Sequence, residues 1–358
     1  MADDALIIGD VRVALGERRD ADLVVSESYS GLPVLVPVTV WRAQEPGPTV
    51  FVTAAVHGDE INGTGIVREI LLSPPFDLRR GSLILVPVVN MLGLERHQRY
   101  LPDRRDLNRS FPGDTVGSLA RRFARAIFAA IVSQCDFGID IHTAAVRRTN
   151  FPNVRADFSI PAAKRLAFAL GSEFVIKGKG PNGSLRRAAC AAGCPTVLLE
   201  AGEVWKIEPG VVEFGVRAIR NGLIDIGMID GSRTQPVHQV RIEKTKWIRA
   251  SFGGILQFHV APGDVVNAGQ ALATNSDLHG KEKRVICSPV SGVVIGMTTL
   301  PVVTPGDPVC HVAIMKKGIE SVRRAFEHAP QTGLHERLRD DLSTSIAVSR
   351  PPDADAVQ

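Results

Sequence analysis

The chain has 358 residues, of which 44% are hydrophobic and 22% are charged, so it has the composition of an ordinary globular protein and exceeds one average domain in length. Its formal net charge of +4, from 42 basic and 38 acidic side chains, is too small and too scattered to indicate binding to nucleic acid. The several arginine pairs are interpreted as solvated faces.

The first residues, MADDALIIGD, are acidic and lack a long apolar core, so no secretory signal is visible. No apolar run reaches the roughly 20 residues that a membrane helix needs. The cysteines are odd in number and form no CxxC motif; Cys190 and Cys194 are spaced like half a metal site, but no second half follows. We therefore expect free thiols and a cytoplasmic protein without a membrane partner, and we leave open whether it forms a homo-oligomer.

Between residues 33 and 228, short β-rich runs alternate with helical segments, which is typical of an α/β domain. After a β-rich lead-in over 1–47, the expected buried strands are 48–56, 82–89, 137–141 and 196–199. The expected helices are 63–72, 118–132, 161–170 and 209–226. Residues 91–115 have no clean period, and a loop of that length in a compact domain is usually functional or disordered.

A different pattern follows residue 231. From 237 to 312, short alternating strands and turn signals such as APGD, SPVSG and TPGD predict a small all-β module. The expected domains are 1–232 for the α/β part, 233–316 for the β-module, and 317–358 for a short helix and a disordered tail that ends in SRPPDADAVQ.

Two predicted strands end in groups that can bind a metal. The motif HGDE at 57–60 directly follows the first buried strand, and DIH at 140–142 closes the third. Ligands gather at the carboxyl ends of parallel strands, and two histidines with one glutamate can hold zinc while leaving a position for water. Alone, H-x-x-E is more often a surface turn, and a strand-end histidine is more often a core residue. Because the two occur together, a zinc site of His57, Glu60 and His142 is the favoured hypothesis.

The long loop and the last strand add further polar groups. The loop contains DLNR at 106–109, with Arg99 upstream; an arginine fork suits a carboxylate, and asparagine adds a neutral donor beside it. A solvated loop is the alternative explanation. Glu200 ends the last buried strand, where a carboxylate is costly without a partner and suits a general base that returns its proton to a leaving amine. Glu203, the nearest competitor, is expected to be exposed.

Together, four motifs resemble the succinylglutamate desuccinylase/aspartoacylase family, relatives of the zinc carboxypeptidases, over roughly residues 48–228. These motifs are HGDE at 57–60, DLNR at 106–109, DIH at 140–142 and LEAG at 199–202. The resemblance implies a zinc carboxypeptidase-like fold, in which helices flank a mixed α/β sheet. It also implies an enzyme that uses zinc to hydrolyse a linear amide, the N-acyl bond of an N-acyl amino acid.

The resemblance also implies roles for single residues. One zinc ion per chain would be held by His57, Glu60 and His142. Glu200 would act as general base and then as general acid. Asp106 would orient a zinc-binding histidine, here His57.

The same resemblance implies which residues contact the substrate. Asn108 and Arg109 would bind the α-carboxylate of the substrate, and Arg99 would polarise the scissile carbonyl and stabilise the oxyanion. Neither of the two tyrosines stands where the family places a late active-site tyrosine, so the side-chain specificity is not implied. Arg186 or Arg187 could contact an acidic substrate group, but an exposed helix face explains them equally well.

The predicted β-module has a resemblance of its own. Residues 253–273, 288–294 and 302–309 are similar to the two halves of a biotinyl/lipoyl-type β-barrel. Lys281 falls near the position of the modified lysine of such domains but lacks the flanking methionines, so modification is not expected. The module is interpreted as a lid, a specificity element or an oligomerisation element.

The expected substrate is a small N-acyl amino acid. Family members with a similar C-terminal extension include deacetylases of N-acetylated diamino acids, so an N-acetyl diamino acid is favoured and an N-succinyl amino acid is retained. The first alternative function is a zinc carboxypeptidase that acts on peptides. The second is a non-catalytic binding protein on the same scaffold.

Overall fold

A computed structural model describes residues 5–28, 30–315, 318–328, 333–343, 346 and 348–349. Of the last twenty-odd residues, which were expected to be disordered, those from residue 350 onward lie outside these described residues, whereas part of the stretch before them forms a helix. Within them, every helix is too short or too polar to cross a membrane.

The N-terminal part of the chain alternates strands and helices, as the apolar runs predict. Its strands are β1 (Leu6–Ile8), β2 (Val11–Val13), β3 (Arg18–Glu27), β4 (Pro33–Arg42), β5 (Glu45–Ala54), β6 (Arg80–Val86), β7 (Phe137–His142), β8 (Arg148–Ala156), β9 (Phe174–Lys177) and β10 (Thr196–Glu203). Its helices are α1 (Asn62–Leu72), α2 (Met91–Leu94), α3 (Leu119–Ala130), α4 (Pro161–Ala169), α5 (Leu185–Ala191) and α6 (Pro209–Ile226), with 3-10 turns η1 (Leu107–Arg109) and η2 (Val132–Gln134).

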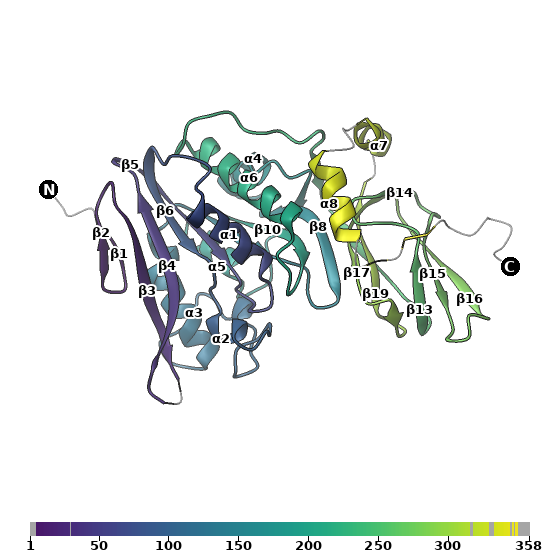
Figure 1. The fold of residues 1–358 in the computed structure, drawn as a ribbon, viewed down its shortest axis with the longest axis horizontal. Helices are drawn as coiled ribbons and strands as arrows, with labels where there is room; N and C mark the ends of the chain where they lie inside the picture. Colours follow the sequence, from purple (N-terminus) through teal and green to yellow (C-terminus); the bar gives the residue numbers. More distant parts are fainter. Residues whose placement is uncertain are drawn as a thin grey trace.

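The C-terminal part consists of short strands followed by two helices. The strands are β11 (Val240–Ile242), β12 (Thr245–Arg249), β13 (Gly254–Phe258), β14 (Val265–Val266), β15 (Ala271–Ser276), β16 (Lys283–Cys287), β17 (Gly292–Thr298), β18 (Val302–Val303) and β19 (Pro308–Ile314). The helices are α7 (Ile319–Glu327) and α8 (Leu334–Ser343), where a single short helix was expected. Figure 1 shows an elongated molecule with β1 to β4 towards one end and β13, β15 and β16 towards the other.

Most strands belong to one mixed sheet, which confirms the predicted fold class. Its order is β12-β19-β17-β8-β10-β7-β5-β6-β4-β3. The central strands β10, β7, β5 and β6 run parallel, and β8 pairs antiparallel with β10. Because β17 pairs antiparallel with β8, this sheet continues into the C-terminal strands. Strands β13, β15, β16 and β18 form a separate four-stranded sheet. The domain boundary at residue 232 remains a prediction.

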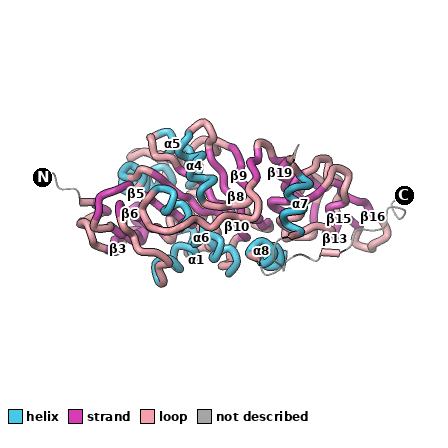
Figure 2. The backbone as a smooth tube through the Cα atoms, turned by 90° about the horizontal axis from the view of Figure 1, so that it is seen from above, coloured by secondary structure: helices cyan, strands magenta, loops and turns pink. Residues whose placement is uncertain are grey.

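Helices cover both faces of the sheet, because successive side chains of a strand point to opposite faces. Val50 of β5 belongs to one core with Ile66 of α1 and Ile219 of α6. Phe51, the next residue, belongs to a second core with Phe123 of α3. All five side chains are fully buried, and burying each contributes about 1.5–3 kcal/mol. Seen from above, α1, α6 and α8 lie along the same side of the strands (Figure 2).

A hydrogen-bonded clamp fixes the end of β10 against the starts of α1 and α6. The Asn62 amide donates 2.7 Å to the Glu208 carboxylate and accepts 2.8 Å from the Glu208 backbone N–H. The Glu203 backbone N–H donates to the same carboxylate at 3.0 Å. Gly202 has a φ of +75°, and a Cβ there would lie 2.1 Å from the Glu208 Oε2 atom. Only glycine therefore fits beside the clamp.

Gly202→Ala is expected to lower the free energy of unfolding in urea by about 3 kcal/mol or more, because a positive φ and a buried overlap act together. Gly193→Ala is the matched control: its φ is +90°, but a Cβ there meets open space. The control should lose only about 1–2 kcal/mol, from backbone strain alone. Equal losses in the two variants would contradict the clamp.

Candidate metal centre and active site

The candidate residues lie at one edge of three neighbouring parallel strands. His142 is the last residue of β7, and Glu200 of β10 is its registered partner. His57 closely follows the end of β5, in a turn that passes tightly over α2. A Cβ on Gly58 would lie 2.0 Å from the carbonyl carbon of Gly93, so only glycine permits this approach. The topology thus brings together the two predicted strand ends and Glu200.

The Glu60 carboxylate lies between two imidazole rings. His57 Nδ1 is 2.7 Å from its Oε1 atom, and His142 Nδ1 is 2.7 Å from its Oε2 atom. The three residues are 2–4% exposed, and their potential ligand atoms all lie within 4.8 Å of one another. Two imidazole nitrogens and a carboxylate oxygen are a donor set that zinc accepts. The group could therefore hold a metal ion, and it fits the predicted zinc.

Each histidine is held from behind by a carboxylate. His57 Nε2 lies 3.1 Å from Asp106 Oδ1, and His142 Nε2 lies 3.0 Å from Asp140 Oδ2. Thr53 of β5 donates 2.8 Å to the other oxygen of Asp140. An Nε2–H donated to a carboxylate leaves the Nδ1 lone pair facing inward, as metal binding requires. Asp106 lies against His57, where its predicted role needs it; Asp140 had no predicted role.

Charge pairing sets the protonation of this cluster. Burial raises the pKa of Glu60, but the charges of His57 and His142 outweigh it and hold that pKa well below its usual range. Burial likewise raises the pKa of Asp106, and the hydrogen bond and charge of His57 lower it well below its usual range. For His142, burial lowers the pKa, while the Asp140 and Glu60 carboxylates raise it well above its usual range. The ionised carboxylates of Glu60 and Asp106 therefore both suit a bound cation.

Arg99 bridges the two carboxylates. Its Nη1 atom lies 3.1 Å from Glu60 Oε1, and its Nη2 atom lies 3.0 Å from Asp106 Oδ2. The side chain is 23% exposed and lines the cavity described below. Its guanidinium is therefore next to the candidate metal ligands. Its predicted role at the scissile carbonyl remains a prediction.

The DLNR segment is locked in place by its own hydrogen bonds. Asp106 caps η1 by accepting from the Asn108 backbone N–H at 2.8 Å. The Asn108 side-chain oxygen accepts from the Leu185 N–H of α5 at 2.8 Å, and its Nδ2 atom lies 3.3 Å from His142 Nε2. Arg109 Nη1 donates to the Asn108 carbonyl at 2.7 Å. These bonds hold Asn108 and Arg109 beside the metal cluster, at the rim of the cavity.

Glu200 is held by two residues that sequence analysis missed. Asn150 Nδ2 donates 2.8 Å to its Oε2 atom, and Arg155 Nη1 lies 3.6 Å from its Oε1 atom. Both partners come from β8, whose sequence RTNFPNVRA contains Pro152. A proline inside a segment argues against a central strand, so the sequence did not predict β8. The polar residues of this segment were the available signal.

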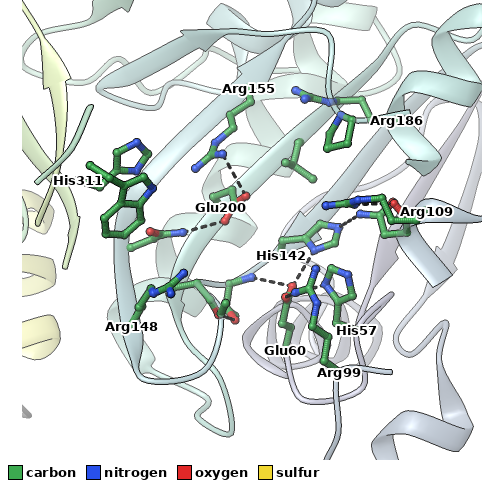
Figure 3. A pocket seen from close by; sticks show the side chains of 18 residues that line it. His57, Glu60, Arg99, Arg109, His142, Arg148, Arg155, Arg186, Glu200 and His311 are labelled. Atoms are coloured by element: carbon green, nitrogen blue, oxygen red, sulfur yellow. Dashed lines mark hydrogen bonds and ion pairs between the residues drawn. The ribbon is translucent and has the colours of Figure 1, made fainter. Parts of the chain in front are cut away.

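A cavity of about 370 Å³ connects these groups. Figure 3 shows Arg109 and Arg186 on one side of it, Arg148 and His311 on the other, and His142 and Glu200 between them. Arg186 is 5% exposed, and its Nη1 atom has no hydrogen-bond partner among the described residues. Burial, with the nearby charge of Arg155, lowers the pKa of Arg186 to about 10.

Three features of the site differ from, or add to, what the sequence predicts. Arg186 lines the cavity, whereas Arg187 is exposed on the outer side of α5. Glu203, expected to be exposed, is only 12% exposed and forms an ion pair with Lys206, so that expectation was wrong. The C-terminal strands supply Trp247 and His311 to the cavity wall, which no local pattern indicated.

Comparisons with known proteins identify the family of the chain. The family model of the succinylglutamate desuccinylase/aspartoacylase catalytic domain matches residues 46–224. An N-alpha-acetyl-L-2,4-diaminobutyric acid deacetylase from Halomonas elongata is 26% identical over 257 residues, covering 68% of this chain and 75% of the relative. The chain therefore belongs to the succinylglutamate desuccinylase/aspartoacylase family, as its four motifs predict.

Solved structures share the fold. The product-bound ectoine utilization protein EutE (DoeB) from Ruegeria pomeroyi has a TM-score of 0.74 at 22% identity, covering 85% of this chain and 97% of its own. A succinylglutamate desuccinylase/aspartoacylase from Rhodobacter sphaeroides has a TM-score of 0.71 at 24% identity, covering 82% and 95%. Because the match spans most of each chain, the shared fold includes much of the C-terminal part.

Removing a candidate ligand should abolish stoichiometric zinc binding. We expect His142→Ala to lose zinc in elemental analysis of purified protein, because only two of three ligands remain. His311→Ala is the matched control, since this histidine lines the same cavity away from the cluster. Glu200→Gln should also keep its zinc. Full zinc retention by His142→Ala, or zinc loss from His311→Ala, would place the metal elsewhere.

Proposed function

We propose that the protein hydrolyses the amide bond of an N-acyl amino acid, with one zinc ion held by His57, Glu60 and His142. The observation that carries the proposal is the strand register of Glu200 beside His142. Besides Glu60, which is a candidate ligand, the cavity therefore contains the carboxylate of Glu200, which is not one of the three candidate ligands. Membership of the family and the deacetylase from Halomonas elongata support the same chemistry.

The residues around the metal suggest how the reaction proceeds. Zinc bound there would polarise the scissile carbonyl and lower the pKa of the attacking water. Glu200 accepts a proton from that water and then donates it to the leaving amine. Asn150 orients the carboxylate through Oε2, and Arg155 faces Oε1 at 3.6 Å. Arg99, beside Glu60, stabilises the negative charge that develops on the carbonyl oxygen.

The amino-acid half of the substrate fits the side of the cavity that carries Arg109 and Arg186. Every N-acyl amino acid has an α-carboxylate, and a guanidinium fork is the matching donor. Arg186 is buried with one Nη atom unpartnered, so an incoming carboxylate would satisfy it. Asn108 projects from the neighbouring loop and adds an amide N–H.

The charge of the cavity bears on the substrate side chain. Five arginines line it, namely Arg99, Arg109, Arg148, Arg155 and Arg186. Among the residues that the structure describes, the acidic ones that line it are Glu60 and Glu200, both assigned to the reaction centre. An ammonium group on the substrate would therefore meet like charges with no free carboxylate. We propose an acidic or neutral side chain in preference to the N-acetyl diamino acid that the Halomonas relative suggests.

The two alternative functions, a peptide carboxypeptidase and a non-catalytic binding protein, would require different features of the same site. A peptide carboxypeptidase needs room for a chain beyond the scissile bond, but the C-terminal strands wall the cavity with Trp247 and His311. A non-catalytic binding protein needs no general base, yet Glu200 is held next to the metal cluster by Asn150. Both observations favour the deacylase. Homo-oligomerisation and a cytoplasmic location remain predictions.

A hydrolysis screen tests this function directly. Zinc-loaded protein is given N-acetyl, N-succinyl and N-formyl amino acids with acidic, neutral or basic side chains, and release of the free amine is measured. Acidic or neutral side chains should give kcat/KM at least about 10-fold higher than basic ones. Faster cleavage of N-acetyl diamino acids would contradict the charge argument. Cleavage of peptides in preference to all these amides would support the carboxypeptidase.

Arg186 and Arg187 form a matched pair for the carboxylate contact. Arg186→Met should lower kcat/KM by about 10²-fold, mainly through KM, because a buried charge-assisted contact is lost. Arg187→Met removes an exposed arginine from the same helix and should change kcat/KM less than about threefold. Steady-state kinetics on the best substrate of the screen distinguish the two. Similar effects of both variants would exclude Arg186 as the specific contact.

A further inference from the structure

Strand β17 of the C-terminal part pairs antiparallel with the first residues of β8 (Figure 1). Its Gly296 is the registered partner of Asn150, and its Thr298 is the registered partner of Arg148. Both of these β8 residues line the cavity, and Asn150 is the residue that donates to Glu200. A strand from the C-terminal part therefore lies directly behind the residue that holds the proposed general base.

The end of β17 also fixes the turn that precedes β8. The Thr298 hydroxyl donates to the Arg147 carbonyl at 3.0 Å, and the Thr299 backbone N–H donates to the same oxygen at 2.9 Å. Arg147 has a φ of +64°, which residues other than glycine rarely adopt. The Thr299 hydroxyl donates in addition to the Glu203 carboxylate at 2.5 Å. These bonds fix the position from which Asn150 reaches Glu200.

Gly296 lies against the side-chain amide of Asn150. A Cβ at Gly296 would lie 2.6 Å from Asn150 Oδ1 and 3.1 Å from the Thr149 carbonyl oxygen. The φ of Gly296 lies outside the left-handed region, so its backbone conformation does not require glycine. The space does, because the Asn150 amide occupies the place that a side chain would take.

The Asn150 amide is planar and rigid, so its oxygen and its nitrogen move together. Its Nδ2 atom donates to Glu200 Oε2 at 2.8 Å, and the residue is only 6% exposed. A group that pushes on Oδ1 therefore also turns the N–H that holds the carboxylate. Hydrogen bonds weaken steeply as their angle departs from linearity.

We propose that Gly296 is a positioning residue for the general base. Its missing side chain lets β17 hold the Asn150 amide at the angle that orients the Glu200 carboxylate. This proposal rests on the proposed deacylase function, in which Glu200 moves the proton. The C-terminal strands then contribute to the proton-transfer step, in addition to forming one wall of the cavity.

Adding one methyl group tests this role. Gly296→Ala should lower kcat by about 10- to 100-fold on the best substrate of the screen, with KM changed less than about threefold, because the base is misdirected while the substrate contacts remain. The closest overlapping atom is the end of a side chain, so the amide moves and the sheet persists. Zinc content should stay stoichiometric, since the three candidate ligands lie on other segments.

Gly253→Ala is the matched control. Gly253 also belongs to the C-terminal part and has no positive φ, but a Cβ there would meet nothing nearer than 3.6 Å. This variant should keep the kcat and the KM of the wild-type protein. An equal fall of kcat in both variants, or a rise of KM with unchanged kcat in Gly296→Ala, would contradict the positioning role.

A double-mutant cycle separates the amide from the backbone. Asn150→Ala alone should lower kcat about as much as Gly296→Ala. Adding Gly296→Ala to Asn150→Ala should cost less than about threefold more, because no amide is left to displace. Losses that multiply would show that Gly296 acts through the backbone at Thr149, and the proposal would fail.

A crystal structure of Gly296→Ala provides a test that needs no activity. Asn150 Nδ2 should lie beyond about 3.5 Å from Glu200 Oε2, compared with 2.8 Å in the wild-type protein. An intact Asn150–Glu200 bond in this variant would overturn the proposal, whatever the kinetics show. If wild-type protein hydrolyses no N-acyl amino acid, the proposed function fails and the role in proton transfer fails with it, while this structure still decides whether Gly296 orients Asn150.

Discussion

The burial of one carboxylate, that of Glu60, constrains the whole site. This side chain is 2% exposed, and an ionised carboxylate in such a place costs several kcal/mol unless donors or cations surround it. His57, His142 and Arg99 supply them, together with the backbone N–H of Thr143 at 3.2 Å. These groups come from the end of β5, the end of β7 and the long loop. Folding must therefore bring these three segments together around one charge, which is also the charge a metal needs.

One sheet connects the strands that carry the metal cluster with the strands that form the far wall of the cavity. Glu200 is in register with His142, and its partner Asn150 comes from the next strand, β8. Strand β8 also pairs with β17 and so leads into the C-terminal strands that carry Trp247 and His311. The proposed general base and the Trp247–His311 wall of the cavity thus belong to one continuous sheet.

Sequence alone predicted the features that depend on local pattern. The apolar runs placed β5, β7 and β10, and α6 has its predicted bounds, since these elements are long and strongly patterned. The four motifs together predicted the family, although each was weak alone. Contacts between distant segments had no local signal: Pro152 hid β8, and only the orientation of α5 distinguishes Arg186 from its neighbour. Trp247 lies in the site because its strand, β12, belongs to the same sheet as β10. No periodic pattern in the sequence indicates that the sheet continues this far.

We propose that one zinc ion is held between the Nδ1 atoms of His57 and His142 and the carboxylate of Glu60. Anomalous diffraction from zinc-loaded crystals, recorded on both sides of the zinc absorption edge, tests it most directly. We expect a single strong peak about 2.0–2.2 Å from the two Nδ1 atoms and a carboxylate oxygen of Glu60, with both Nε2 atoms still facing Asp106 and Asp140. A peak at another site, or coordination through Nε2 of either histidine, would contradict it.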